Sequence, residues 1–319
     1  MFSTELLAAN LLSPVVLAFA LGLIARGLRS DLEIPAAIQS YLSIFLLLAI
    51  GLKGGAALRN DAPDNLAVFI VATFFLGVIT AVSAYFLAKA WLRDSRIDAA
   101  AIAAHFGSVS AVTFIAAQQF SERSGQPADS VLVALVVVME IPAILIGLAL
   151  AKGAQGIRWH DVREVVTGKT ALLLLGGLAI GALSSKDGLA KVDAMYFQLF
   201  QGTLMLFMLD MGMLAAGQLR LVGRDAFRLG IYATAVPLLH GTLGVFIGHW
   251  IGMSASTAAV FGTMAASASY IAAPASIRAS LPDANVGRCI TAALGFTFPF
   301  NLAVGVPVYF ALAKSLQPS

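Results

Sequence analysis

Long runs of apolar residues, separated by short polar or Pro/Gly-bearing segments, dominate this sequence. An α-helix needs about 20 residues to cross roughly 30 Å of hydrocarbon, and most of the runs reach that length. The runs are continuously apolar, whereas lipid-facing β-barrel strands alternate over about ten residues. The pattern therefore predicts an all-α integral membrane protein. It predicts ten spans, at about 11–29, 35–57, 64–92, 97–120, 129–152, 168–186, 193–217, 226–251, 254–279 and 286–314.

The composition supports this class, since 59% of the 319 residues are hydrophobic and 12% are charged. Soluble domains carry about a quarter charged residues. The net charge of +3 is too small to indicate nucleic acid as a partner. The single cysteine, Cys289, excludes an intramolecular disulfide. No Walker-type phosphate loop occurs, so any transport would be driven by an ion gradient or by the substrate's own gradient.

Basic residues are distributed unevenly between alternate loops. One side collects 14 of the Lys and Arg residues and the other side 6. The richer side is expected to be cytoplasmic, which places both termini outside. Its members are Arg26, Arg29, Lys89, Arg93, Arg96, Lys152, Arg158, Arg163, Lys169, Arg220, Arg224, Arg228, Arg278 and Arg288.

The two halves of the chain resemble each other. A displacement of 159 residues superimposes Ser108 and Ser110 on Ser267 and Ser269. Five spans in each half would force the second copy to enter the membrane from the opposite side, as in the inverted repeats of many secondary transporters. The alternative is a chance match between small and apolar residues. The predicted division is a first repeat at 1–152, a cytoplasmic linker at 153–167 and a second repeat at 168–319.

Two segments rich in small and hydroxyl residues occupy matching positions in spans four and nine. They are GSVSAVTF at 107–114 and ASASYIAAP at 266–274. Small residues allow close backbone approach, hydroxyls and unwound carbonyls coordinate cations, and half-helix N-termini attract anions. Pro274 disfavours helix at Ala273, so the ninth span is expected to break near its middle. The competing interpretation is that both segments only pack helices.

Several polar residues lie inside the predicted spans. Glu140 and Asp210 would each be costly if ionised in lipid, so both are expected to face protein or water and to bind or couple an ion. His105 and His240 are candidates for a proton relay, or else hydrogen-bonded core residues. Asn301 is a candidate to line the same cavity.

Five segments carry a resemblance to a known family. They are IGLKGGAALRN (50–60), GSVSAVT (107–113), MEIPA (139–143), MGMLAAGQL (211–219) and AASASYIAAPASIRASLPDAN (265–285). In order and spacing they resemble the SbtA-type sodium-dependent bicarbonate transporters of cyanobacteria and other bacteria. The match covers nearly the whole chain.

The resemblance implies a 5+5 inverted-repeat transporter of the bacterial inner membrane that usually assembles as a homotrimer. Spans 1, 2, 6 and 7 would form a gate domain, and spans 3–5 and 8–10 a core domain with an elevator-like movement. The fourth and ninth helices would cross, and their breaks would hold bicarbonate and Na⁺, with no other cofactor. The linker 153–167 is much shorter than in cyanobacterial members, which weakens the expectation of a PII-like regulator.

The resemblance carries the family's binding motifs onto Gly107, Ser108, Ser110, Thr113, Ser267 and Ser269. We expect these residues and Tyr270 to bind substrate, and we expect Ser110 and Ser269, together with the acidic residues Asp210 and Glu140 inside the spans, to bind or couple an ion. The family has serine where this chain has Val112 and Ala272, and aspartate where it has Tyr270. These replacements remove oxygen ligands, and Asp210 would supply a charge from the neighbouring domain.

The leading interpretation is a secondary transporter that imports bicarbonate with Na⁺. The alternative is a related small-anion or monocarboxylate carrier coupled to H⁺ or Na⁺ through Glu140, Asp210 or His105. A membrane sensor would ordinarily add a soluble output domain, which the short loops do not accommodate. An enzyme is disfavoured because the sequence offers no compact His/Asp/Glu cluster.

Overall fold

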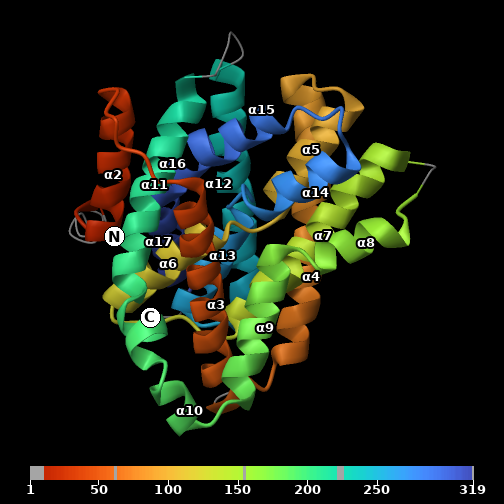
Figure 1. The fold of residues 1–319 in the computed structure, drawn as a ribbon. Helices are drawn as coiled ribbons and strands as arrows, with labels where there is room; N and C mark the ends of the chain where they lie inside the picture. Colours follow the sequence, from red (N-terminus) through yellow and green to blue (C-terminus); the bar gives the residue numbers. More distant parts are fainter. Residues whose placement is uncertain (1–10, 61–62, 154–155, 221–225, 318–319) are drawn as a thin grey trace.

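The computed structural model describes residues 11–60, 63–153, 156–220 and 226–317. These residues form helices and connecting segments without a strand (Figure 1). The first half contains α2 (Pro14–Gly27), α3 (Ala36–Asn60), α4 (Leu66–Leu87), α5 (Arg96–Gly107), α6 (Ala111–Arg123) and α7 (Leu132–Lys152). The second half contains α8 (Trp159–Val166), α9 (Lys169–Leu183), α10 (Lys186–Ala190), α11 (Phe200–Arg220), α12 (Ala226–Trp250), α13 (Ala255–Ala265), α14 (Ala272–Ser280), α15 (Val286–Ile290), α16 (Phe298–Phe300) and α17 (Val306–Ser315).

Seven helical segments in the described ranges are long and apolar enough to cross a membrane, or eight if α8 and α9 form one bent span. The predicted all-helical membrane class is therefore confirmed. The predicted number of ten spans is not reached by this criterion. The first predicted span contains the 14-residue α2, and the ninth is divided between α13 and α14.

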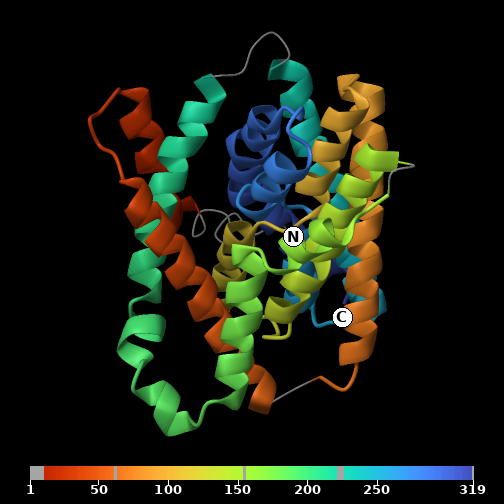
Figure 2. The same ribbon diagram turned by 45° about the vertical axis from the view of Figure 1, so that its right-hand side comes forward.

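The helices pack in two groups. The four-helix group consists of α2, α3, α9 and α11, in which α3 packs along α9 and α2 packs along α11 (Figure 2). The crossing group consists of α4–α7 and α12–α17, with α4, α5 and α7 packed on one another and α12 and α17 packed on α13. The two groups meet where α7 contacts α3 and α9, and where α11 contacts the π-helical segment Thr291–Thr297.

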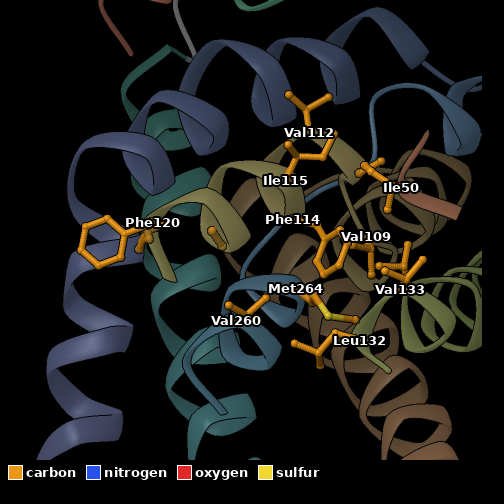
Figure 3. Packing of buried hydrophobic residues seen from close by; sticks show 14 of the residues in the cluster. Ile50, Val109, Val112, Phe114, Ile115, Phe120, Leu132, Val133, Val260 and Met264 are labelled. Atoms are coloured by element: carbon orange, nitrogen blue, oxygen red, sulfur yellow. The ribbon is translucent and has the colours of Figure 1, made fainter. Parts of the chain in front are cut away.

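An apolar cluster lies where the two groups meet. Figure 3 shows Val112 and Ile115 of α6 among side chains that include Ile50 of α3, Val133 of α7 and Met264 of α13. Each of these five side chains is at most 2% exposed. The four-helix group therefore contacts the crossing group through closely packed carbon side chains.

Glycines bring helices of the four-helix group into backbone contact. A Cβ atom added to Gly22 would overlap the carbonyl oxygen of Leu209 on α11, and one added to Gly212 would overlap the carbonyl oxygen of Phe19 on α2. Close backbone approach of this kind stabilises helix pairs in membranes, where no hydrophobic effect drives them together.

The Gly212→Ala variant is therefore expected to lose about 1–3 kcal/mol of stability, because its methyl group must displace the backbone of α2. Gly202→Ala on the same helix is the matched control. A Cβ at Gly202 would meet no atom of the described residues within 4 Å. Alanine there is expected to be neutral or slightly stabilising. Thermal unfolding in detergent measures both, and equal unfolding temperatures would contradict the packing argument.

Candidate functional site

The predicted fourth and ninth spans are both interrupted. Residues 108–110 separate α5 from α6, and residues 266–271 separate α13 from α14. The second interruption ends before Pro274, which lies in the first turn of α14. A proline is tolerated there because its missing N–H would have no partner within the helix. The expectation that helix is lost at Ala273 was wrong, since that residue is helical.

The two interruptions are hydrogen-bonded to each other. The backbone N–H of Ser110 donates to Ser267 Oγ at 2.8 Å, and the backbone N–H of Ser269 donates to the carbonyl oxygen of His105 at 2.8 Å. Ser267 Oγ in turn donates to the carbonyl oxygen of Met264 at 2.8 Å. These bonds satisfy backbone groups that irregular structure would leave without partners inside a membrane.

Neighbouring helices support the same crossing. Asn301 Nδ2 donates to the carbonyl oxygen of Ala266 at 2.7 Å, so Asn301 holds the backbone at the second interruption. Thr80 Oγ1 of α4 lies 3.4 Å from the carbonyl oxygen of Gly107. A Cβ atom on Gly107 would lie 2.5 Å from the Cβ of Ala81. Glycine at this position is therefore what allows α4 and the end of α5 to approach.

Ser110 and Ser269 have equivalent local roles. Ser110 Oγ accepts a hydrogen bond from the N–H of Thr113 at 3.2 Å and caps α6. Ser269 Oγ accepts from the N–H of Ala273 at 3.2 Å in the first turn of α14. Each hydroxyl still has its own hydrogen to donate. The N-termini of these helices also carry partial positive charge.

A small cavity of about 10 Å³ lies beside the two interruptions. It brings together three of the predicted binding residues, Ser110, Ser269 and Tyr270, with the predicted coupling residue Glu140. A volume of this size holds about one water molecule or a small ion. The remaining lining residues are Val109, Ala111, Thr170, Ile271 and Ala272.

A wider cavity of about 350 Å³ shares part of the lining of the small one and extends to the end of the molecule where α8 and α9 meet. The two cavities share Glu140, Thr170, Ile271 and Ala272. Two charged side chains, Glu164 and Lys169, line the wider cavity near this end. The crossing is therefore approached from the side of the linker between α7 and α9.

A family model for the Na⁺-dependent bicarbonate transporter superfamily matches residues 14–314. The chain belongs to this superfamily. The resemblance drawn from the sequence motifs is thereby confirmed, and the chain is a multi-pass membrane protein of a transporter family. A search of curated proteins finds no match.

Asp210 does not line either of the two cavities beside the interruptions. Gln39 Nε2 of α3 donates to Asp210 Oδ1 at 2.9 Å, and both residues line a third cavity of about 430 Å³ with Arg26 and Glu33. Among the residues that the structure describes, none that lines this cavity lines either of the other two. The structure therefore brings Glu140, but not Asp210, to the small cavity.

Four other predicted binding residues shape the crossing without lining the small cavity. They are Gly107, Ser108, Thr113 and Ser267.

The three positions at which the chain departs from the family pattern lie in different parts of the structure. Tyr270 and Ala272 line the small cavity, whereas Val112 packs in the apolar cluster of Figure 3. The replacement at Val112 therefore removes no oxygen from the cavity lining.

Thr170 is the lining residue that the sequence analysis missed. It lies in the first turn of α9, in the predicted sixth span, and is 4% exposed. Its position at the cavity depends on packing between α7 and α9, which are separate in sequence. No signal in the sequence distinguishes it from the other hydroxyl residues in the spans.

Proposed function

We propose that the chain is a secondary transporter that imports bicarbonate together with Na⁺. The observation that carries this proposal is the pair of cavities at the interruptions. The N-termini of α6 and α14 and the hydroxyls of Ser110 and Ser269 adjoin the small cavity, and the wider cavity that shares its lining has room for an anion larger than one water molecule. Helix N-termini and hydroxyl donors favour a small anion. Membership of the superfamily supports bicarbonate as that anion and Na⁺ as its companion.

We further propose ten spans arranged as a 5+5 inverted repeat. Helix α5 begins at Arg96 and α13 at Ala255, and the difference, 255 − 96 = 159, equals the displacement found in the sequence. The packed pairs α3 with α9 and α11 with α2 are related by the same displacement. Short α2 and split α13–α14 count as spans in this arrangement.

In the proposed mechanism, the four-helix group is the gate and the crossing group is the core that moves against it. The wider cavity leads from the small cavity toward the linker, so the conformation described here would be the one open to that side. Assembly as a homotrimer in a bacterial inner membrane remains a prediction, and the short linker weakens the expectation of regulation by a PII-like partner.

The excess of basic residues supports a cytoplasmic linker with both termini outside. The termini, 1–10 and 318–319, lie outside the described residues. The orientation in the membrane is therefore tested at exposed positions within the described residues. His160 on α8 has a side chain that is 78% exposed, and Ser185 precedes α10 on an exposed turn. In a Cys289→Ser background, Ser185→Cys is expected to react with an impermeant thiol reagent in intact cells, and His160→Cys only after lysis. The reverse pattern would contradict the orientation.

Uptake of isotope-labelled bicarbonate into proteoliposomes tests the function itself. A tenfold inward Na⁺ gradient supplies about 1.4 kcal/mol per ion, so one-to-one symport is expected to accumulate bicarbonate about tenfold. Protein-free liposomes and an equal K⁺ gradient are the controls. Uptake that is the same in Na⁺ and K⁺ would contradict Na⁺ coupling.

Competition separates the proposal from its alternative, a small-anion or monocarboxylate carrier coupled to H⁺ or Na⁺. Formate and acetate resemble bicarbonate in charge but lack its hydroxyl group. If either one is taken up in preference to bicarbonate, the substrate assignment is wrong, and a dependence on external pH without Na⁺ would identify H⁺ as the coupled ion.

A further inference from the structure

Glu140 is a buried carboxylate that has no partner among the described residues. Its side chain lies on α7, is 3% exposed, and lines both the small and the wider cavity. Within the described ranges it forms neither a hydrogen bond nor an ion pair. A carboxylate inside a membrane protein is costly unless a cation or hydrogen-bond donors compensate it. Glu140 therefore marks a place where a bound ion would be stabilised.

A second unsatisfied oxygen lines the same space from the other helix group. Thr170 Oγ1 on α9 is buried and has no hydrogen-bond partner in the described residues. Most threonines buried inside helices bond to a carbonyl one turn earlier, as Thr73 and Thr80 do here. Thr170 lies in the first turn of α9 and lines both cavities together with Glu140.

The remaining polar groups around the small cavity are also oxygens. The Tyr270 hydroxyl is buried beside Ser110 and has no hydrogen-bond partner of ordinary geometry among the described residues. Ser110 and Ser269 complete the set. A carboxylate surrounded by hydroxyl oxygens, with no nitrogen or sulfur in the side chains of the described lining residues, suits a hard monovalent cation. The cavity of about 10 Å³ matches one small ion.

We propose that Na⁺ binds between the Glu140 carboxylate and the Thr170 hydroxyl, with Tyr270 as a further oxygen ligand. The site joins α7 of the crossing group to α9 of the four-helix group. It deepens the proposed function, because it rests on Na⁺ as a transported ion and on the two groups as moving parts.

The location of the two ligands has a consequence for the transport cycle. If the crossing group moves against the four-helix group, Glu140 moves away from Thr170 and the ion loses a ligand. A ligand shifts a conformational equilibrium by its differential affinity for the two states. Na⁺ bound at this site therefore stabilises the conformation open toward the linker.

Binding of ²²Na⁺ to the purified protein, in detergent and without bicarbonate, tests this site. Thr170→Val preserves the shape of the side chain and removes its oxygen, so it is expected to weaken Na⁺ binding about tenfold, as for loss of one interaction with a charged group. Thr170→Ser retains the hydroxyl and is expected to bind like the parent. Glu140→Gln is expected to abolish saturable binding, whereas Asp210→Asn, in the separate cavity, is expected to leave it unchanged.

Parental Na⁺ affinity in Thr170→Val would overturn the site, as would parental affinity in Glu140→Gln. A loss of binding in Asp210→Asn but not in Thr170→Val would move the ion to the third cavity and overturn it as well. Because Thr170→Val is nearly isosteric, it decides the matter even if Glu140→Gln fails to fold. The measurement contains no bicarbonate, so its failure counts against this site alone, whereas failure of the uptake experiment counts against the proposed substrate and its coupling.

Discussion

Joining α3 to α7 by a disulfide is expected to stop bicarbonate uptake almost completely. A Cβ atom added to Gly54 of α3 would lie 2.8 Å from the Cβ of Val133 of α7. Disulfides have Cβ–Cβ distances of about 3.5–4.5 Å, so a Gly54→Cys/Val133→Cys pair needs only a small separation to form one. The two helices belong to different groups, and a covalent bond between them prevents the relative movement that the proposed mechanism requires. Uptake is measured after oxidation and again after reduction, in a Cys289→Ser background.

A second pair of equal geometry is the control. A Cβ atom added to Gly147 of α7 would lie 2.7 Å from the Cβ of Ala104 on α5. Both helices belong to the crossing group, so an Ala104→Cys/Gly147→Cys disulfide is expected to leave uptake in place. The reduced form of each variant controls for damage done by the substitutions themselves. Full uptake by the oxidised Gly54/Val133 pair would rule out movement between the two groups at this contact.

The sequence predicts the position of the helices well because apolar length is a local property. The two interruptions fall within the segments 107–114 and 266–274, where small and hydroxyl residues replace large apolar ones. Pro274 was a poorer guide to the exact position, because a proline is compatible with the first turn of a new helix. Ser110 and Ser269, which are related by the 159-residue displacement, each accept a hydrogen bond from the first turn of the helix that follows them.

Which side chains line a cavity together depends on contacts between helices that are distant in the sequence. The sequence alone therefore predicts the cavity linings less well than the helices. Glu140 and Asp210 look alike in the sequence, since each is a single acidic residue within a span. Helix packing separates them: Asp210 accepts a hydrogen bond from Gln39 in one cavity, and Glu140 lines another cavity together with Thr170. Which face a polar residue presents depends on neighbouring helices, which a single sequence does not specify. Whether either residue couples an ion stays a prediction.

Replacing Ser110 or Ser269 by alanine is expected to raise the apparent KM for bicarbonate about tenfold or more. Each substitution removes a hydroxyl that adjoins the small cavity, and a hydrogen bond to a charged group contributes about 1.5–3 kcal/mol. Each also removes a hydrogen bond to the first turn of a helix, which costs about 1 kcal/mol of stability. Threonine retains the hydroxyl, so Ser110→Thr and Ser269→Thr are expected to recover part of the affinity. The KM is measured from initial rates in proteoliposomes.

Two other serines provide control variants, which distinguish the loss of a hydrogen bond to a helix N-terminus from the loss of a substrate ligand. Ser95 caps α5 by accepting from the N–H of Asp98, and Ser254 caps α13 by accepting from the N–H of Thr257. They are also related by 159 residues, and neither lines the small cavity. Ser95→Ala and Ser254→Ala are expected to lower thermal stability by a similar amount without changing the KM, because only the cap is lost. If all four alanine variants change the KM equally, the hydroxyls of Ser110 and Ser269 serve only to hold the helices, and the anion must be bound by other groups.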